Sequence, residues 1–199
     1  MDLSAFDLKG KVALITGGAH GIGFSIAEGM AKCGAAICFN CSSEASLEKG
    51  MAAYKAAGID AHGYAADVSD EDAVNAMVAK IKAEVGPVDI LVNNAGIQIR
   101  EWATDFKVED FDKVLAVNLR AYYLASRAAA RYMKEQGGGS IVCISSGNSE
   151  RYTTRRSAYN ISKAAVNGLV GTLGVEWGRF NVRINGVAPG YVMTDMIQK

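Results

Sequence analysis

The sequence has little of what marks a membrane protein or a nucleic-acid-binding protein. No apolar run approaches the ~20 residues that a helix needs to cross a bilayer. Lysine and arginine number 21, as do aspartate and glutamate, so no basic surplus favours nucleic acid and no charge block favours a membrane surface. The N-terminal stretch MDLSAFDLKGK has no basic segment followed by a long apolar one. We therefore expect no signal peptide and a cytoplasmic protein.

Cysteine is also scarce, with four residues in the chain. Cys38 and Cys41 form a C-x-x-C pattern, but they end the strand-like run AAICFNC. Residues three apart on a strand point to opposite faces. No second pair and no nearby histidine completes a set of metal ligands. We expect reduced cysteines in or near the core and no metal site.

The chain has two prolines, no low-complexity linker and no internal repeat, and its 199 residues suit one domain, residues 1–199. Short β-rich runs alternate with longer helical stretches. The strand-like runs are 11–16, 35–40, 60–67, 89–95, 140–146 and 182–188, and the helices begin at the glycine-rich stretch and near Ser46, Glu71, Val108 and Ser157. This alternation predicts a parallel sheet covered on both faces by helices.

Four glycines stand where predicted helices end and a left-handed residue is favoured. They are Gly34, Gly58, Gly86 and Gly178.

A glycine-rich stretch, TGGAHGIG at residues 16–23, follows the first strand-like run. Backbone N–H groups at the start of the next helix can face a phosphate, and missing side chains allow close approach. Gly17 would permit the tight turn, and Gly21 and Gly23 would bring a pyrophosphate and the strand close to the helix. The spacing G-x-x-x-G-x-G differs from the dinucleotide fingerprint G-x-G-x-x-G. A tight turn with close packing is therefore an open alternative.

A tyrosine and a lysine share one face of the predicted helix SAYNISKAAVNGLV, because Tyr159 and Lys163 are four residues apart. A lysine ammonium close to a phenol favours the phenolate, which gives a proton donor or acceptor usable near neutral pH. Ser146 ends the run SIVCISS at the same predicted sheet edge and can steady a substrate oxygen. On spacing alone, an ordinary amphipathic helix is the alternative.

The motifs in combination resemble the short-chain dehydrogenase/reductase family along essentially the whole chain. They are T-G-x-x-x-G-I-G, NNAG after the fourth strand, Ser146 thirteen residues before Tyr159, Y-x-x-x-K, and PGYVMT. The resemblance implies a Rossmann-type, doubly wound parallel sheet in a three-layer α/β/α arrangement that binds a dinucleotide. It also implies hydride transfer between a nicotinamide and a secondary alcohol or ketone. Because family members continue further, we expect these 199 residues to lack their C-terminal helix, strand and substrate-covering segment; a fragment and a shorter functional chain are both open.

The resemblance also implies roles for individual residues. Tyr159 would be the general acid or base, Lys163 would support it and hold the nicotinamide ribose, Ser146 would bind the substrate oxygen, and Asn118 would hold a relay water. A helix cap is the alternative for Asp67, which precedes VSDED. The implied cofactor-binding residues are Gly17, Gly21, Ile22, Gly23, Asp67, Val68, Asn94, Ala95, Gly96, Tyr159, Lys163, Pro189, Gly190, Val192 and Thr194.

The end of the second strand bears on which nicotinamide cofactor binds. An acidic residue there would accept the ribose 2′-hydroxyl of NAD and repel the 2′-phosphate of NADP. This chain has the uncharged stretch FNCSS, in which Ser42 and Ser43 can donate to a phosphate, and His20 of the glycine turn can lie close by. We expect NADP(H), with NAD(H) possible because Glu44 could reach the ribose. A helix cap is an alternative use of the two serines.

The substrate is indicated by sequence similarity within the family and by arginines. The stretches GMAAYKAAGIDAHGYAADVSDED and EVGPVDILVNNAGI are most similar to gluconate 5-dehydrogenases, whereas FNCSSEAS is closer to 3-oxoacyl-carrier-protein reductases. Arg100 and Arg151, with Arg155 and Arg156 near Tyr159, can pair with a substrate carboxylate, and a solvated charged loop is the alternative. A sugar-acid oxidoreductase is therefore expected. A 3-oxoacyl-thioester reductase and a non-catalytic nucleotide-binding module are the alternatives, and the family implies a homodimer or homotetramer.

Overall fold

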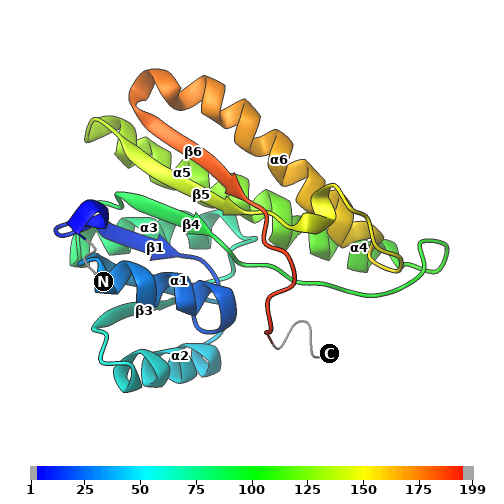
Figure 1. Cartoon of the computed structure of the whole chain (residues 1–199), viewed down its shortest axis with the longest axis horizontal. Helices are drawn as coiled ribbons and strands as arrows, with labels where there is room; N and C mark the ends of the chain where they lie inside the picture. Colours follow the sequence, from blue (N-terminus) through cyan, green and yellow to red (C-terminus); the bar gives the residue numbers. More distant parts are fainter. Residues whose placement is uncertain (1–3, 195–199) are drawn as a thin grey trace.

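The computed structural model describes residues 4–194 and contains one six-stranded parallel sheet (Figure 1). The strands run in the order β3-β2-β1-β4-β5-β6. Their bounds are β1 Val12–Ile15, β2 Ala36–Cys41, β3 Ala61–Ala65, β4 Ile90–Asn93, β5 Gly139–Ile144 and β6 Val182–Val187. Each lies within a residue of the predicted run or inside it, so the predicted doubly wound parallel sheet is confirmed.

Helices connect the strands and give the sheet its two outer layers. They are α1 Gly21–Lys32, α2 Glu44–Ala56, α3 Glu71–Glu84, α4 Val108–Leu115, α5 Ala121–Glu135 and α6 Ser157–Trp177. A π-helical segment, η2 Ala116–Arg120, joins α4 to α5, and single 3₁₀ turns lie at Ser4–Phe6, Gly147–Ser149 and Gly178–Phe180. Within residues 4–194, no helix is long and apolar enough to span a bilayer.

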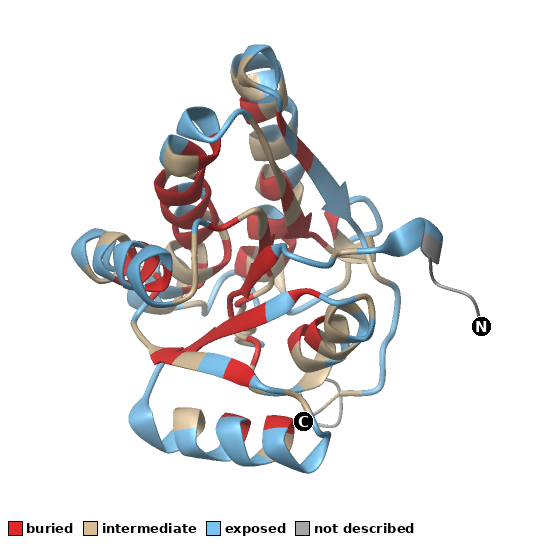
Figure 2. Ribbon diagram, turned by 90° about the vertical axis from the view of Figure 1, so that its left-hand side faces the viewer, coloured by how far each residue is buried: buried red, intermediate tan, exposed pale blue. Residues whose placement is uncertain are grey.

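Alternate residues of the strands face two separate hydrophobic clusters. Val12 and Leu14 of β1 belong to a cluster with residues of α3, α5 and α6, whereas Ala13 and Ile15 belong to a cluster with residues of α1 and α2. This is the two-residue period of a strand covered on both faces. Figure 2 shows the buried strands at the centre and the exposed outer surfaces of the helices.

The strand order places a switch point at the middle of the sheet. From β1, the chain builds outward through β2 and β3, and it then returns to the other side of β1 for β4, β5 and β6. The connections after β1 and β4 therefore leave in opposite directions. In open sheets of this kind, a crevice forms at the carboxyl ends of the two central strands.

The cysteines of β2 lie as the sequence predicted. Cys38 faces the first cluster and Cys41 the second, and both are buried free thiols. Desolvation, with a smaller contribution from Glu84, raises the pKa of Cys38 to about 12. Because the thiolate is the reactive form, a thiol with so high a pKa is poorly suited to redox chemistry at neutral pH, and Cys38 serves as a packing residue.

One predicted helix end was wrong. Gly34, Gly58 and Gly86 have positive φ angles of 95°, 71° and 141°, but Gly178 has φ −54° and continues into a 3₁₀ turn. The left-handed residue is Asn181, at φ 58°. Asparagine tolerates this conformation better than most residues. Its Nδ2 donates to Gly137 O at 3.0 Å, so one residue both ends the turn and anchors it to the loop between α5 and β5.

Candidate active site

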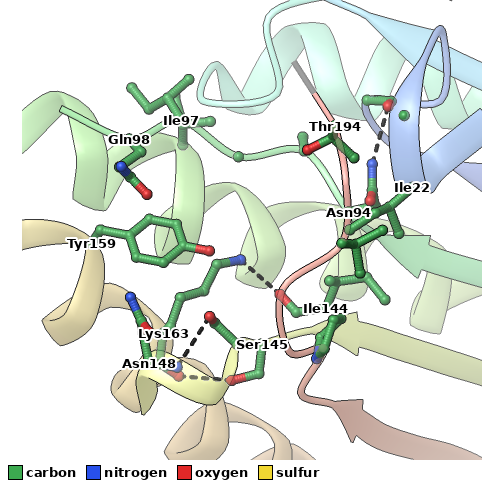
Figure 3. A pocket seen from close by; sticks show the side chains of 18 of the residues that line it. Ile22, Asn94, Ile97, Gln98, Ile144, Ser145, Asn148, Tyr159, Lys163 and Thr194 are labelled. Carbon is green, nitrogen blue, oxygen red and sulfur yellow. Dashed lines mark hydrogen bonds between the residues drawn. The ribbon is translucent and has the colours of Figure 1, made fainter. Parts of the chain in front are cut away.

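A cavity of about 1160 Å³ opens at the carboxyl edge of the sheet, where all six strands end. The segments after β1 and β4, on either side of the switch point, both line it (Figure 3). Most of the predicted site residues line this cavity: Gly17, His20, Gly21, Ile22, Ser42, Asp67, Val68, Asn94, Ala95, Gly96, Ser146, Arg151, Tyr159, Lys163, Pro189, Gly190, Val192 and Thr194. Four do not: Gly23, Ser43, Arg100 and Asn118.

The glycine turn brings α1 close to β1 and leaves the start of the helix open. Gly17 and Gly21 are left-handed, with φ 63° and 59°. A Cβ on Gly23 would lie 2.5 Å from Asn94 Nδ2 and 2.6 Å from Gly17 O, so this position has no room for a side chain. His20, the N-cap residue of α1, makes no side-chain cap. The first N–H groups of the helix are thus left without a side-chain acceptor beside the cavity, the arrangement that suits a phosphate.

A threonine and an asparagine tie the turn to the segment after β4. Thr16 Oγ1 accepts from Asn94 N at 3.0 Å and from Ala95 N at 3.1 Å, and it donates to Val92 O at 3.4 Å. Asn94 Nδ2 donates to Thr16 O and Gly17 O, both at 3.0 Å. The amide nitrogen of Asn94 therefore supports the turn itself. Sequence reasoning named Asn94 and missed Thr16, although both belong to the motifs that it used.

The two serines that follow β2, Ser42 and Ser43, have different surroundings. Ser42 lines the cavity, as His20 does. Ser43 caps α2, because its Oγ accepts from Ser46 N at 3.3 Å. The cap that the sequence left as an alternative is thus the observed use of Ser43, while Ser46 takes its place on the cavity wall.

Asp67, in the segment after β3, was predicted either to bind the cofactor or to cap a helix. Its Oδ1 accepts from Ser69 N at 2.8 Å and from Ser69 Oγ at 2.7 Å, which closes a turn beside the cavity. The cap of α3 is Asp70, whose side chain accepts from Ala73 N at 3.0 Å. The helix-cap alternative for Asp67 is therefore wrong, because the N-cap residue of α3 is three positions further on.

Tyr159 and Lys163 converge on the cavity from one face of α6, as their spacing predicted (Figure 3). Lys163 Nζ lies 5.9 Å from the centre of the Tyr159 ring. The lysine is 3% exposed and its Nζ donates to Ile144 O at 2.7 Å and to Tyr122 Oη at 3.2 Å. Burial lowers the pKa of Lys163 to about 8, although Cys143 acts in the opposite direction. The amine is thus held by three elements at once, α5, β5 and α6.

Two adjacent serines after β5 have different surroundings. Ser145 is 3% exposed, and its hydroxyl lies within hydrogen-bond distance of two acceptors, Asn167 Oδ1 at 2.8 Å and Lys163 O at 3.1 Å. Ser146 is only half-buried, caps a 3₁₀ turn and accepts from Asn148 N at 3.1 Å. Its own proton is therefore available to an acceptor in the cavity, which suits the role that the sequence suggested.

Asn118 is fully buried in the π-helical segment and does not line the cavity. Its Oδ1 accepts from Ile97 N at 2.8 Å, and its Nδ2 donates to Ile97 O at 3.0 Å and to Ser162 Oγ at 3.1 Å. The side chain thus ties the segment after β4 to α6. Its role toward a relay water stays a prediction.

The structure separates the arginines. Arg151 and Arg156 line the cavity, whereas Arg100 is exposed and does not. Next to Arg100, two loops are in contact: Glu101 N donates to Arg155 O at 3.1 Å, and the side chains of these two residues approach to 4.0 Å. This contact fixes the loop next to Arg100, and the side chain of Arg100 lies in solvent. Lys113, Gln98 and Tyr152 also line the cavity, and no sequence pattern had marked them.

The chain has extensive similarity to known proteins. A family profile described as short chain dehydrogenase matches residues 11–199. A gluconate 5-dehydrogenase of Gluconobacter oxydans is 39% identical over 194 residues, which cover 98% of this chain and 76% of the relative. A 5-keto-D-gluconate 5-reductase of Escherichia coli is 40% identical over 191 residues, which cover 96% and 75%.

A solved structure is similar in three dimensions. It is a gluconate 5-dehydrogenase from Burkholderia cenocepacia in complex with NADP and tartrate. The TM-score is 0.91 at 36% identity, and the match covers 98% of this chain and 76% of the other.

Two glycines of α1 give a matched test of the turn. In Gly23→Ala, the new Cβ meets Asn94 Nδ2 and Gly17 O, and we expect the free energy of unfolding to fall by about 1–3 kcal/mol. In Gly29→Ala, nothing lies within 4 Å of the new Cβ, and we expect a gain of about 0.5–1 kcal/mol from helix propensity. Urea unfolding measures both. Equal effects would mean that the turn does not depend on close approach.

The buried lysine predicts a pH dependence of stability. Because the pKa of Lys163 falls from 10.5 to about 8 on folding, the unfolded chain binds more protons than the folded chain between those values. The stability penalty for burying the ammonium is therefore full below pH 8 and is lifted as the pH rises. Relative to Lys163→Met, the wild type should gain about 2 kcal/mol between about pH 7.5 and 9.5. Urea unfolding of both proteins across this range would contradict the assignment if the difference stayed constant.

Proposed function

The chain belongs to the short-chain dehydrogenase family, and from this premise we propose that it interconverts a hydroxyl and a keto group of a sugar acid by hydride transfer with a nicotinamide dinucleotide. It is an oxidoreductase that acts on CH–OH groups. The observation that carries the proposal is the meeting of Tyr159, Lys163 and the glycine turn on one cavity. We propose that residues 1–199 act as one dinucleotide-binding domain.

The residues present fit a dinucleotide. Gly17 and Gly21 hold the turn in left-handed conformations, the position of Gly23 has no room for a side chain, and the start of α1 faces the cavity. These features bring backbone N–H groups toward a pyrophosphate. When bound, the dinucleotide supplies or accepts the hydride.

The chain's own residues manage the proton. During reduction, the hydroxyl of Tyr159 donates its proton to the substrate oxygen, and the ammonium of Lys163 stabilises the phenolate that remains. Ser146 donates a hydrogen bond to the same oxygen. During oxidation, the phenolate takes the proton from the substrate hydroxyl. Asn118 keeps the segment after β4 in place against α6.

NADP(H) is the preferred cofactor in this proposal, with NAD(H) as the alternative. Ser42 and His20 line the cavity near the end of β2, and Glu44, which could have favoured NAD, does not line it. The similar structure from Burkholderia cenocepacia is a complex with NADP.

The proposed substrate is anionic. Lys113, Arg151 and Arg156 line the cavity, and none of them forms an ion pair within the described residues. A carboxylate is the natural partner of such cations. Relatives named for gluconate and 5-keto-D-gluconate support the same class. These names give no support to a 3-oxoacyl-thioester reductase, and the complete Ser–Tyr–Lys set argues against a non-catalytic module.

The assay uses purified protein, NADPH or NADH, and a panel of 5-ketogluconate and an acetoacetyl thioester. We expect turnover of 5-ketogluconate with NADPH. Tyr159→Phe should lower kcat by about 10²- to 10⁴-fold because the proton donor is lost. Tyr64→Phe is the control, since that buried phenol lies outside the cavity and its hydroxyl donates to Glu84 at 3.0 Å. Full activity of Tyr159→Phe would refute the mechanism, and turnover of the thioester alone would refute the substrate class.

A homo-oligomer, dimer or tetramer, completes the proposal. A groove along α4, η2 and α5 is lined by Leu115, Leu119 and Tyr123, with Asp112 and Arg120 beside them, and Tyr123 is 41% exposed. An apolar surface of this kind is typical of subunit contacts. Sedimentation velocity at micromolar concentration should give a mass above that of one chain. A monomer throughout that range would exclude this part. A cytoplasmic location stays a prediction.

A further inference from the structure

A second tyrosine touches the active-site lysine, and no motif had marked it. Tyr122 lies on α5, is 1% exposed and does not line the cavity. Its hydroxyl lies within hydrogen-bond distance of two groups, Ile144 O at 3.1 Å and Lys163 Nζ at 3.2 Å. Lys163 Nζ also donates to Ile144 O at 2.7 Å. The three polar atoms form a closed triangle between α5, β5 and α6.

The chemistry of this triangle fixes the direction of each hydrogen bond. A carbonyl oxygen only accepts, so the single proton of Tyr122 goes to Ile144 O. An ammonium only donates, so the Tyr122 oxygen accepts from Lys163. Desolvation, together with Cys143 and Tyr159, raises the pKa of Tyr122 well above its ordinary value, so Tyr122 stays a neutral phenol that can play both parts.

We propose that Tyr122 is a positioning residue for Lys163. The Tyr122 hydroxyl and the carbonyl of Ile144 accept two of the three ammonium N–H hydrogen bonds, and the third N–H is left for the cavity where Tyr159 lies. The inference rests on the proposed function, since it assigns Lys163 the role described above. Tyr122 does not line the cavity, and it therefore acts only through the lysine.

The hydroxyl of Tyr122 also supports the charge of Lys163. Burial pulls the pKa of this lysine down to about 8, and an acceptor on the ammonium opposes that pull. The titratable groups that face the amine are Cys143 on β5, Tyr159 on α6 and Tyr122 itself. Burial raises the pKa of Cys143 to about 11, so that group is a neutral thiol at pH 7, and its sulfur, which accepts from Asn93 Nδ2 at 3.5 Å, is only a weak acceptor. Without the Tyr122 hydroxyl, the lysine should lose its proton at lower pH.

The first measurement follows Lys163 directly. In protein labelled with ¹³Cε-lysine, the Lys163 resonance is identified by its loss in Lys163→Met, and its titration gives the midpoint of deprotonation. We expect Tyr122→Phe, which keeps the ring and deletes only the hydroxyl, to lower that midpoint by about one pH unit or more. Tyr122→Met is a second variant that lacks the hydroxyl and keeps an apolar side chain, and it should shift the midpoint in the same direction.

The second measurement follows the reaction. For reduction of the best ketone in the panel, Tyr122→Phe should lower kcat at pH 8 by about tenfold, and the fall of kcat on the alkaline side should begin at lower pH. KM for the ketone should stay within about twofold, because Tyr122 does not reach the cavity. Tyr64→Phe is the control for a deleted buried hydroxyl and should leave the midpoint and the pH profile unchanged.

The outcomes separate the two proposals. If both Tyr122 variants kept the wild-type Lys163 midpoint and the wild-type pH profile, Tyr122 would be a packing residue and the inference would be overturned. If Tyr159→Phe kept full activity, the proposed mechanism would fail. The lysine titration needs no turnover, so it would still decide whether Tyr122 holds the charge of Lys163.

Discussion

The candidate active site depends on one buried ammonium, that of Lys163, whose hydrogen bonds must be accepted by the protein. An ammonium removed from water is unstable unless acceptors replace the water. Lys163 is 3% exposed, and its acceptors come from β5 and α5, elements that are remote from it in sequence. The sheet, the helix that carries Tyr159 and the helix that carries Tyr122 must therefore meet at this point for the lysine to be both buried and charged. The same contacts that complete the core thus give the site its polarity.

A second set of hydrogen bonds supports the part of the cavity next to the glycine turn, again by giving buried polar groups a partner. Thr16 and Asn94 join the ends of β1 and β4 at the switch point of the sheet. Each satisfies backbone groups that the end of a strand leaves unpaired. The glycine turn is held open in this way without side chains that would fill the space. Asn94, which the sequence marked as a cofactor contact, here supports the wall of the cavity with its side chain.

Local patterns were sufficient for part of this structure. The strands follow from apolar runs, and the approach of Tyr159 to Lys163 follows from the pitch of one helix. The role of Tyr122 could not be predicted, because it is 41 residues from Lys163 and resembles any aromatic residue in a core helix. The buried position of Asn118 depends on a π-helical segment that no residue pattern predicted. Asn181 ends a helix in place of a glycine, since its side chain finds a partner in a distant loop.

The contact between Glu101 and Arg155 has a consequence for how the substrate range can change. It joins the loops that follow β4 and β5 through a backbone hydrogen bond, and Arg155 also lies 5.8 Å from the centre of the Trp102 ring. Both loops form the wall of the cavity beside Tyr159. Replacing one of these loops with that of a homologue would remove the contact between Glu101 and Arg155 and displace the other loop. New specificity is therefore most accessible to recombination that exchanges both loops as a unit.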